Sequence, residues 1–237
     1  MTAPGPALVL ALPGQWQALP LGADDEIAAE IAVFVRAHFG RRDDQATLRN
    51  EQRARLGEAA RRARDAGALQ FHLSLTAPGG AALASTVAEY RPQLPLGSLA
   101  EPAAVADALV CVLATQDVGA GAGAGAEAGA DTAAADTHWA AFAAAGGAVF
   151  DRGDGLVLRT SRRIEPVDAE RDAPTAIVDY WLTVPDRADV VLLSFTTALA
   201  ELAPLITELF DAIVSAAQWS PAPRDPASSA LRAELAP

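Results

Sequence analysis

The clearest hydrophobic pattern in this chain lies in residues 177–219. Apolar side chains recur at every second position in residues 177–184 and again in residues 190–197, and this period predicts a pair of β-strands. Pro185 stops the first strand, and the polar residues that follow it are typical of a turn. Because both faces of this hairpin are apolar, we expect a sheet that is covered on two sides.

The pattern changes to a helical one after Thr197. Apolar residues then recur at intervals of three and four positions, at Leu202, Leu205, Ile206, Leu209, Phe210 and Ile213. This spacing predicts a helix with one face packed on the sheet. Pro204 falls in its first turn, where a missing N–H is tolerated, and Trp219 and Pro221 close it. We therefore expect a long C-terminal helix.

Weaker patterns predict the elements that come earlier in the chain. Residues 8–21 are apolar with two prolines, which is typical of an extended lead-in or a short edge strand. The remaining predicted elements are two helices that end near Gly40 and Gly67, a hairpin at residues 69–76 and 82–90, helices at residues 99–115 and 137–145, and strands between residues 149 and 164. Residues 109–113 could be strand instead of helix.

This order of elements predicts one α+β domain over residues 1–220. Its centre is expected to be a mainly antiparallel sheet of about five to seven strands flanked by helices. Residues 117–136 are a Gly and Ala tract without the large apolar groups that offset chain ordering, so we expect a flexible connector within the domain. The proline-rich residues 221–237 are expected to be a disordered tail.

The amino-acid composition of the chain limits the kinds of molecule that it is expected to bind. The chain has 237 residues, of which 51% are hydrophobic, and this is enough for a sizeable core. The formal net charge of -12 argues against nucleic acid and anionic membranes as partners, because phosphate binding needs clustered positive charge. All 18 basic residues are arginine, and together with abundant alanine this composition is typical of a bacterium with a GC-rich genome.

The sequence also indicates the cellular compartment of the protein. No positive residue precedes the short apolar run at residues 7–12, and no stretch approaches about 18 uninterrupted apolar residues. We therefore expect a cytoplasmic protein.

No residue pattern predicts a cofactor, a metal or a catalytic centre. Gly121, Gly123 and Ala126 match the dinucleotide fingerprint formally, but more Gly and Ala follow where the motif requires a helix. The three histidines are not spaced as metal ligands, and Cys111 lies in an apolar run, where we expect a buried thiol. Neither a Gly-x-Ser-x-Gly elbow nor a phosphate-loop lysine is present. We expect no enzymatic activity and no cofactor.

Three residues in the second half of the chain are candidates for contact with another protein. Arg159 and Arg163 share one face of their predicted strand, with Ser161 between them. Trp181 shares the face of its own strand with polar neighbours. Arginine and tryptophan are enriched at binding hot spots, so we predict a contact surface here. Packing of Trp181 beneath a helix is the alternative.

The second predicted helix carries a cluster of arginines that includes Arg61 and Arg62. One interpretation is a solvated face with intrahelical pairs such as Glu58 to Arg62, and the other is docking on an acidic partner. The integrin-type tripeptide at residues 152–154 is interpreted as a turn.

The C-terminal part of the chain resembles a known family. Residues 178–219 resemble the closing strand pair and helix of Mog1/PsbP-like proteins, in particular uncharacterised actinobacterial members. The matching positions are Tyr180, Val184, Pro185, Leu193, Phe195, Thr196, Phe210, Asp211, Ala212, Ile213 and Trp219, and Ala198 stands where the family commonly has proline. The resemblance implies an antiparallel sheet in an α/β/α sandwich and a non-enzymatic role in binding proteins. Members bind a small GTPase, serve as a photosystem subunit or are secreted mycobacterial lipoproteins, so the fold does not select the partner.

The function that we expect is that of a non-enzymatic, cytoplasmic adaptor or accessory protein that binds another protein. The alternative is a helix-grip-like carrier of a small apolar ligand, because that fold has a similar order of strands and helices. An apolar pocket of about 300 Å³ or more between the terminal helix and the sheet would favour the carrier. The sequence leaves the partner and the oligomeric state open.

Overall fold

Seven strands in the described part of the chain form one antiparallel sheet. The computed structural model describes residues 5–39, 46–76, 80, 82–96, 98, 100–116, 132–166 and 173–221. The strand order is β2 (Gln15–Leu19), β3 (Gln70–Thr76), β4 (Ala82–Tyr90), β8 (Val190–Thr197), β7 (Thr175–Thr183), β6 (Leu156–Ile164) and β5 (Ala148–Asp151). All six neighbouring pairs are antiparallel, and the predicted α+β class is confirmed.

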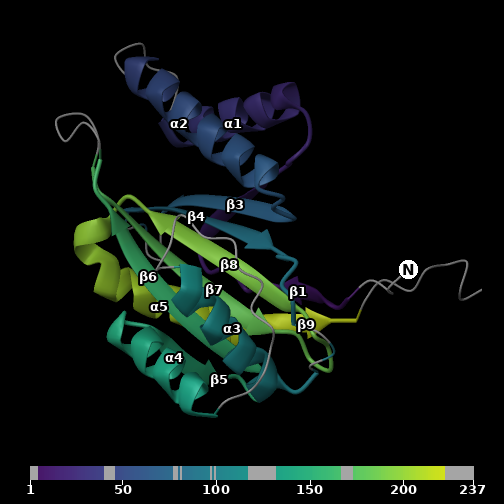
Figure 1. The fold of residues 1–237 in the computed structure, drawn as a ribbon. Helices are drawn as coiled ribbons and strands as arrows, with labels where there is room; N and C mark the ends of the chain where they lie inside the picture. The colour runs from purple at the N-terminus through teal and green to yellow at the C-terminus, as the bar shows by residue number, and fades with distance from the viewer. Residues whose placement is uncertain are drawn as a thin grey trace, which may run out of the picture.

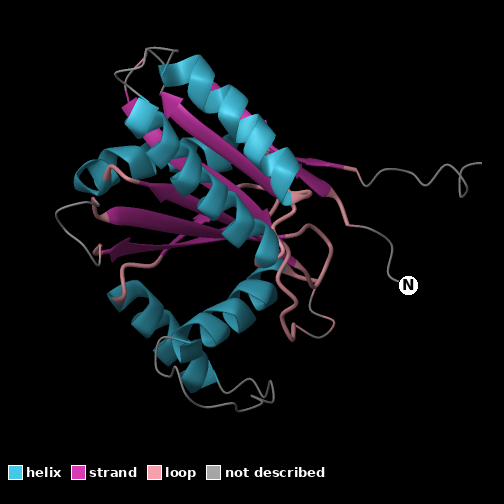
Figure 2. Cartoon of the chain, turned by 90° about the horizontal axis from the view of Figure 1, so that it is seen from above, coloured by secondary structure: helices cyan, strands magenta, loops and turns pink. Residues whose placement is uncertain are grey.

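Helices cover both faces of this sheet (Figure 1). One face carries α1 (Asp24–Phe39) and α2 (Ala46–Asp65) at the β2–β3–β4 side, and α3 (Pro102–Gln116) and α4 (Thr132–Ala144) at the β6–β7 side. The other face carries the 3-10 turn η2 (Ala200–Leu202) and α5 (Ala203–Ala216), beside a ribbon of β1 (Ala7–Val9) and β9 (Gln218–Ser220). In Figure 2 the strands run between helices on both sides.

Strand β7 is buried from both sides. Val178, Tyr180 and Leu182 point to the α5 face and are no more than 2% exposed. Trp181 points to the opposite face and packs in the cluster that contains Leu109 of α3. The prediction of a sheet covered on two sides is therefore confirmed, and it explains why even the polar residues Asp179 and Thr183 on the Trp181 face are buried.

Phe210 anchors α5 to the sheet. Its ring is fully buried and stacks on Phe195 of β8 with 4.4 Å between the ring centroids. Phe195 in turn meets Tyr180 of β7 edge-on at 5.5 Å. Aromatic pairs in these arrangements contribute beyond the area that they bury. Of the predicted apolar stripe, Ile206, Phe210 and Ile213 are buried, whereas Leu202 and Leu205 are exposed.

The C-terminal helix is not the long helix that we predicted. α5 spans 14 residues, Ala217 is extended, and the chain continues into β9, so Trp219 lies in a strand. Arg152 provides a physical reason for the stop. Its guanidinium donates to the carbonyl oxygens of Val214, at 3.1 Å, and of Ala217, which are the groups that a further helical turn would need.

The tripeptide at residues 152–154 forms the β5–β6 turn, as predicted. The Arg152 N–H donates to the carbonyl oxygen of Gly155 at 3.0 Å, and Gly153 has a φ of 81°, a left-handed conformation that favours glycine. The Arg152 side chain is only 5% exposed because it lies against the end of α5. The tripeptide is thus part of the packing of α5, and its arginine is not presented to a partner.

Two regions differ from the sequence prediction, and one open alternative is decided. α4 begins at Thr132, so residues 132–136 are helical and not connector, which agrees with the high helix propensity of their alanines. The lead-in contains two strands, β1 and β2. Residues 109–113 lie inside α3, so the strand alternative is wrong. Residues 117–131, with the formal dinucleotide match, and residues 222–237 lie outside the described residues.

Among the helices of the described ranges, none is long and apolar enough to cross a membrane.

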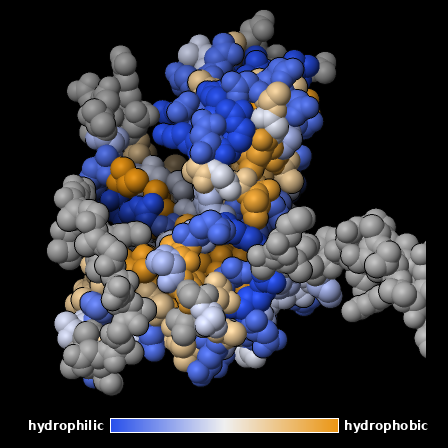
Figure 3. All heavy atoms as spheres, turned by 45° about the vertical axis from the view of Figure 1, so that its right-hand side comes forward, coloured by the Kyte–Doolittle hydropathy of each residue, from blue (hydrophilic) through white to orange (hydrophobic). Residues whose placement is uncertain are grey.

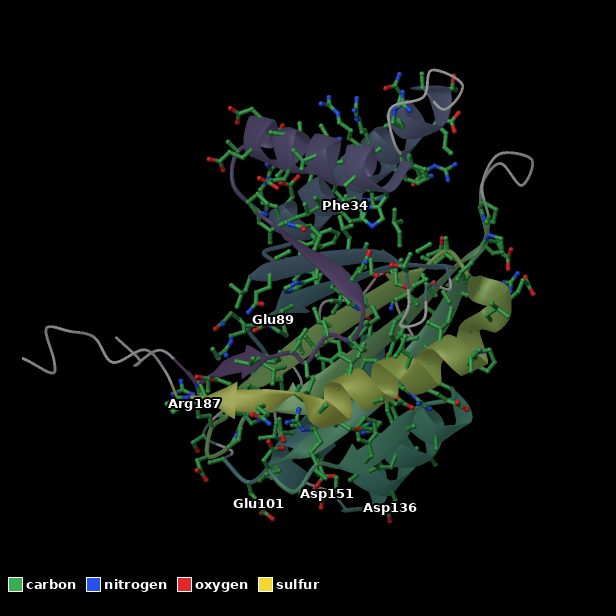
Figure 4. The ribbon with its side chains drawn as sticks, turned by 180° about the vertical axis from the view of Figure 1, so that it is seen from behind. Phe34, Glu89, Glu101, Asp136, Asp151 and Arg187 are labelled. Atoms are coloured by element: carbon green, nitrogen blue, oxygen red, sulfur yellow. The ribbon has the colours of Figure 1, made fainter. Side chains whose placement is uncertain are left out.

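One carboxyl group is buried in the α5 face of the sheet. Glu89 of β4 is 3% exposed, and its Oε2 atom has no hydrogen-bond partner among the described residues (Figure 4). Burial raises the pKa of this carboxyl, and the charge of Arg91 opposes the shift. The protonated form is therefore the form that the folded state favours.

Replacing Phe210 tests the anchor of α5. Phe210→Ala leaves a cavity against Phe195, so we expect the free energy of unfolding to fall by about 3–5 kcal/mol. Leu205→Ala is the matched control, since Leu205 lies on the same helix but is 65% exposed, and its effect should stay within about 0.5 kcal/mol. Urea unfolding of both variants measures the difference. Equal losses would show that α5 does not depend on this contact.

Glu89 predicts a specific pH dependence of stability. Because its pKa is raised in the folded state, its favourable contribution is complete below the ordinary glutamate pKa and is lost as the pH rises through the raised pKa. Glu89→Gln should therefore gain stability relative to the wild type as the pH rises across this range. Unfolding curves at several pH values measure this difference, with Glu101→Gln, at an exposed position, as the control. A constant difference at all pH values would contradict it.

Candidate functional site

A groove lies between the end of β6 and the N-terminal half of α5. Its volume is about 510 Å³. The strand wall comes from β6 and β7 and is formed by Arg159, Ser161, Arg162, Arg163, Ala176 and Val178. The helix wall comes from η2 and α5 and is formed by Ala200, Ala203, Pro204, Thr207, Glu208 and Asp211.

The alternation along β6 explains why a groove forms at this place. Val157 belongs to the core under α5 and is 1% exposed. The next residues on the same strand face are Arg159, Ser161 and Arg163, all of them polar. The apolar contact between strand and helix therefore ends at Val157, and polar side chains with small apolar neighbours line the space beyond it.

Asp211 links the helix wall to both strands. One carboxylate oxygen accepts a hydrogen bond from the phenol of Tyr180 in β7 at 2.7 Å, and the other accepts from the guanidinium of Arg159 in β6. The Asp211 side chain is 33% exposed and that of Arg159 is 25% exposed, so this ion pair is only partly screened by water. The three side chains hold α5 at a fixed position over β6 and β7.

Tyr180 takes part as a donor and not as an acid. Burial raises the pKa of its phenol, and the hydrogen bond to Asp211 and the charge of that carboxylate raise it further. The phenol therefore stays protonated throughout the physiological range. Its hydroxyl group serves to position Asp211 and is unsuited to proton transfer at neutral pH.

Arg163 closes the outer end of the groove. Its guanidinium donates to Glu165 at 2.5 Å and to Glu201 of η2 at 2.7 Å. These two bonds raise the pKa of Arg163, Glu201 contributing the larger part. Because the Arg163 side chain is 43% exposed, the pair with Glu201 contributes little to stability and can rearrange when a partner approaches.

Strand β6 has an open edge beside the groove. β5 pairs only with Leu156 to Arg159, and its last pair is Ala148 with Arg159. Residues 160–164 pair with β7 on one side and, within the described ranges, have no strand on the other. Alternate backbone N–H and C=O groups of these five residues therefore point outward without a sheet partner.

The opposite face of the sheet carries a second polar cluster. Asp179 of β7, with a side chain that is 9% exposed, accepts hydrogen bonds from Ser194 of β8 at 2.5 Å and from Arg162 of β6. Burial and the charge of Asp179 raise the pKa of Tyr90 nearby. This cluster ties three strands together, and its carboxylate is already bonded on both oxygens.

Arg159 and Arg163, two of the predicted contact residues, are brought together in the groove. Trp181 is not. It lies opposite Leu158 on the other face of the sheet, half-buried against α3, so the alternative of packing beneath a helix holds. Its indole N–H is buried and has no hydrogen-bond partner in the described part of the chain.

Arg61 and Arg62 lie away from the groove, on α2. Arg61 pairs with Glu58 at 3.3 Å and Arg62 with the same carboxylate at 3.9 Å, in agreement with the solvated-face interpretation. On the face shown in Figure 3, the part of the molecule formed by α1 and α2 is mainly hydrophilic at the front. The predicted contact residues therefore form three separate groups.

The sequence prediction missed the acidic half of the site. Asp211 and Tyr180 appear there only as positions of the family resemblance, and Glu208 and Glu201 do not appear as candidates. One signal was available: Thr207, Glu208 and Asp211 recur at helical spacing on the flank of the apolar stripe of the same helix. The pairing of Asp211 with Arg159 joins residues 52 positions apart, and no local pattern indicates that contact.

Neither a metal-binding cluster in the described residues nor a similar protein indicates a function for this groove. The described ranges contain no group of three or more His, Cys, Asp or Glu side chains that could hold a metal ion. Comparison with protein-family models, curated proteins and solved structures finds no match for this chain. The resemblance of residues 178–219 to Mog1/PsbP-like proteins therefore stays a prediction.

The central position of Asp211 can be tested by its removal. Asp211→Ala leaves Tyr180 and Arg159 without their acceptor, so we expect a loss of about 2–3 kcal/mol in the free energy of unfolding. Glu208→Ala, one turn earlier on the same wall, should change it by no more than about 0.5 kcal/mol. Chemical denaturation of both variants gives the values. Indistinguishable losses would mean that Asp211 does not fix α5.

Proposed function

We propose that this protein binds another protein and that the groove between β6 and α5 is its docking surface. The observation that carries the proposal is the combination of a groove of about 510 Å³ with the open edge of β6 along one wall. Grooves at sheet edges accept segments of other proteins, because main-chain hydrogen bonds give affinity and neighbouring pockets give specificity. The role is that of an adaptor or accessory protein.

The lining of the groove supports protein binding over transport of an apolar ligand. Charged side chains, among them Arg159, Arg163 and Glu208, stand on both walls. The space between α5 and the centre of the sheet is filled by Phe210 stacked on Phe195. A carrier would need a mainly apolar cavity at that place. The helix-grip alternative is therefore the weaker candidate.

The family, the cellular location and the excluded classes of function that the sequence suggests stay predictions. The resemblance to Mog1/PsbP-like proteins agrees with a protein-binding role, but it selects no partner. The cytoplasmic location, the lack of enzymatic activity and the exclusion of nucleic acid and membranes are parts of the same proposal.

The proposal is tested by recovering the partner from the native host with wild-type and blocked protein. Ser161→Trp places a large side chain in the groove at an exposed position, and we expect it to reduce the recovered partner by about tenfold or more. Gln17→Trp makes the same change at an exposed position of β2, the opposite edge strand, and should recover as much partner as the wild type. Affinity purification with mass spectrometry measures both.

Arg62→Ala tests the other candidate surface, on α2, and should also leave recovery unchanged. Loss of the partner with this variant alone would move the docking surface to α2. A wild-type protein that recovers no stoichiometric partner would contradict the proposal as a whole.

A further inference from the structure

We infer that the groove takes an extended segment of the partner, which pairs with the open edge of β6 and places a lysine or arginine side chain against Glu208. The inference rests on the proposed function and names the chemistry of the partner at the same site. Three observations carry it: the register of β6, the difference between the two edges of the sheet, and the balance of charge in the groove.

The register of β6 leaves room for one additional strand. Residues 160–164 form a regular ladder with β7, without a register shift, while β5 stops at Arg159. An added segment of about five residues matches the usual length of a strand. Its alternate side chains would stand on the α5 face beside Arg159, Ser161 and Arg163 of β6, which line the groove, so a long side chain could reach across this row into it.

The other edge of the sheet is protected in a way that β6 is not. Between Gln15 and Gln17 the pairing of β2 with β3 shifts register, which marks a bulge or irregularity. Pro13 and Pro20 flank this strand. Bulges and prolines are the devices by which proteins prevent strand addition. Over residues 160–164 neither device is present, so the open edge of β6 is the one suited to a partner strand.

The charges in the groove favour a basic side chain. Arg159 is neutralised by Asp211, and Arg163 by Glu165 and Glu201. Glu208 lies on the helix wall and has no ion-pair partner among the described residues. Arg162, the third arginine of the lining, pairs with Asp179 on the opposite face of the sheet. Each arginine of the groove therefore has a carboxylate partner, and the carboxylate of Glu208 is left to attract a basic side chain.

The shape of the groove also suits a long basic side chain. Ala203 and Pro204 give the helix wall an apolar surface of small side chains. Lysine and arginine bury their aliphatic stems on such surfaces and keep the charged group at the polar end. With the stem across these residues, the charged group can reach the carboxylate of Glu208.

A second copy of this chain does not fit the same edge. Antiparallel pairing of two β6 edges centred on residue 162 would bring Arg162 opposite Arg162 of the other copy, and pairing centred between residues 162 and 163 would bring Arg162 opposite Arg163. Like charges directly opposite each other destabilise a strand pair. The partner is therefore a different chain.

A displayed library of random twelve-residue peptides, selected on the full-length protein, tests the inference. Ser161→Trp protein serves for counter-selection. We expect the enriched peptides to share a lysine or arginine within an alternating, strand-forming sequence. Binding of the best peptide to Glu208→Lys protein should be about tenfold weaker than to the wild type. Two methylated forms of this peptide, one with its odd-numbered and one with its even-numbered backbone nitrogens methylated, distinguish strand pairing from other modes. One form should lose binding and the other should keep it, because only alternate N–H groups of an added strand face β6.

The opposite results would overturn the inference. These are enrichment of acidic or helical peptides, equal binding to Glu208→Lys protein, tolerance of methylation in both registers, or no enrichment at all. The proposed function is judged separately, by the host partner. If that partner is lost with Ser161→Trp while the library yields no basic extended peptide, the groove is the docking surface but the mode of recognition proposed here is wrong.

Discussion

The position of α5 on the sheet is the constraint on which the rest of this structure depends. Phe210 stacks on Phe195 in the core, and Asp211, the next residue, bonds to Tyr180 and Arg159 at the border of the core. Two neighbouring residues thus fix the helix by an apolar contact on one side and a charge-assisted contact on the other. Arg152 holds the far end of the same helix through its last carbonyl groups. The groove lies between α5, which is held over β7, and the polar end of β6.

This arrangement explains how one element serves both stability and recognition. The buried stripe of α5 carries the packing, and the residues on its flank, Thr207, Glu208 and Asp211, form a wall of the groove. β6 divides in the same way, since its first half is paired on both sides and its second half on one side only. A partner strand would complete the half that the chain leaves open, without disturbing the core.

Most of the fold could be predicted from the sequence, because the period of two in residues 177–184 and 190–197 and the helical period after Thr197 are strong local signals. The end of α5 could not, since it depends on Arg152, more than 60 positions away. The site was predictable in part. Alternation alone placed Arg159 and Arg163 on one face, but their acidic partners and the separation from Trp181 follow from tertiary packing and strand order, which local patterns do not contain.

The central claim is that residues 160–164 of β6 form an open edge that a partner completes. Amide hydrogen exchange of these five residues, measured by NMR in the free protein and with the recovered partner, tests it most directly. The account predicts that alternate amides exchange rapidly in the free protein, while those bonded to β7 are protected, and that the rapid ones become protected on binding. Protection of all five amides in the free protein, or no change when the partner binds, would contradict it.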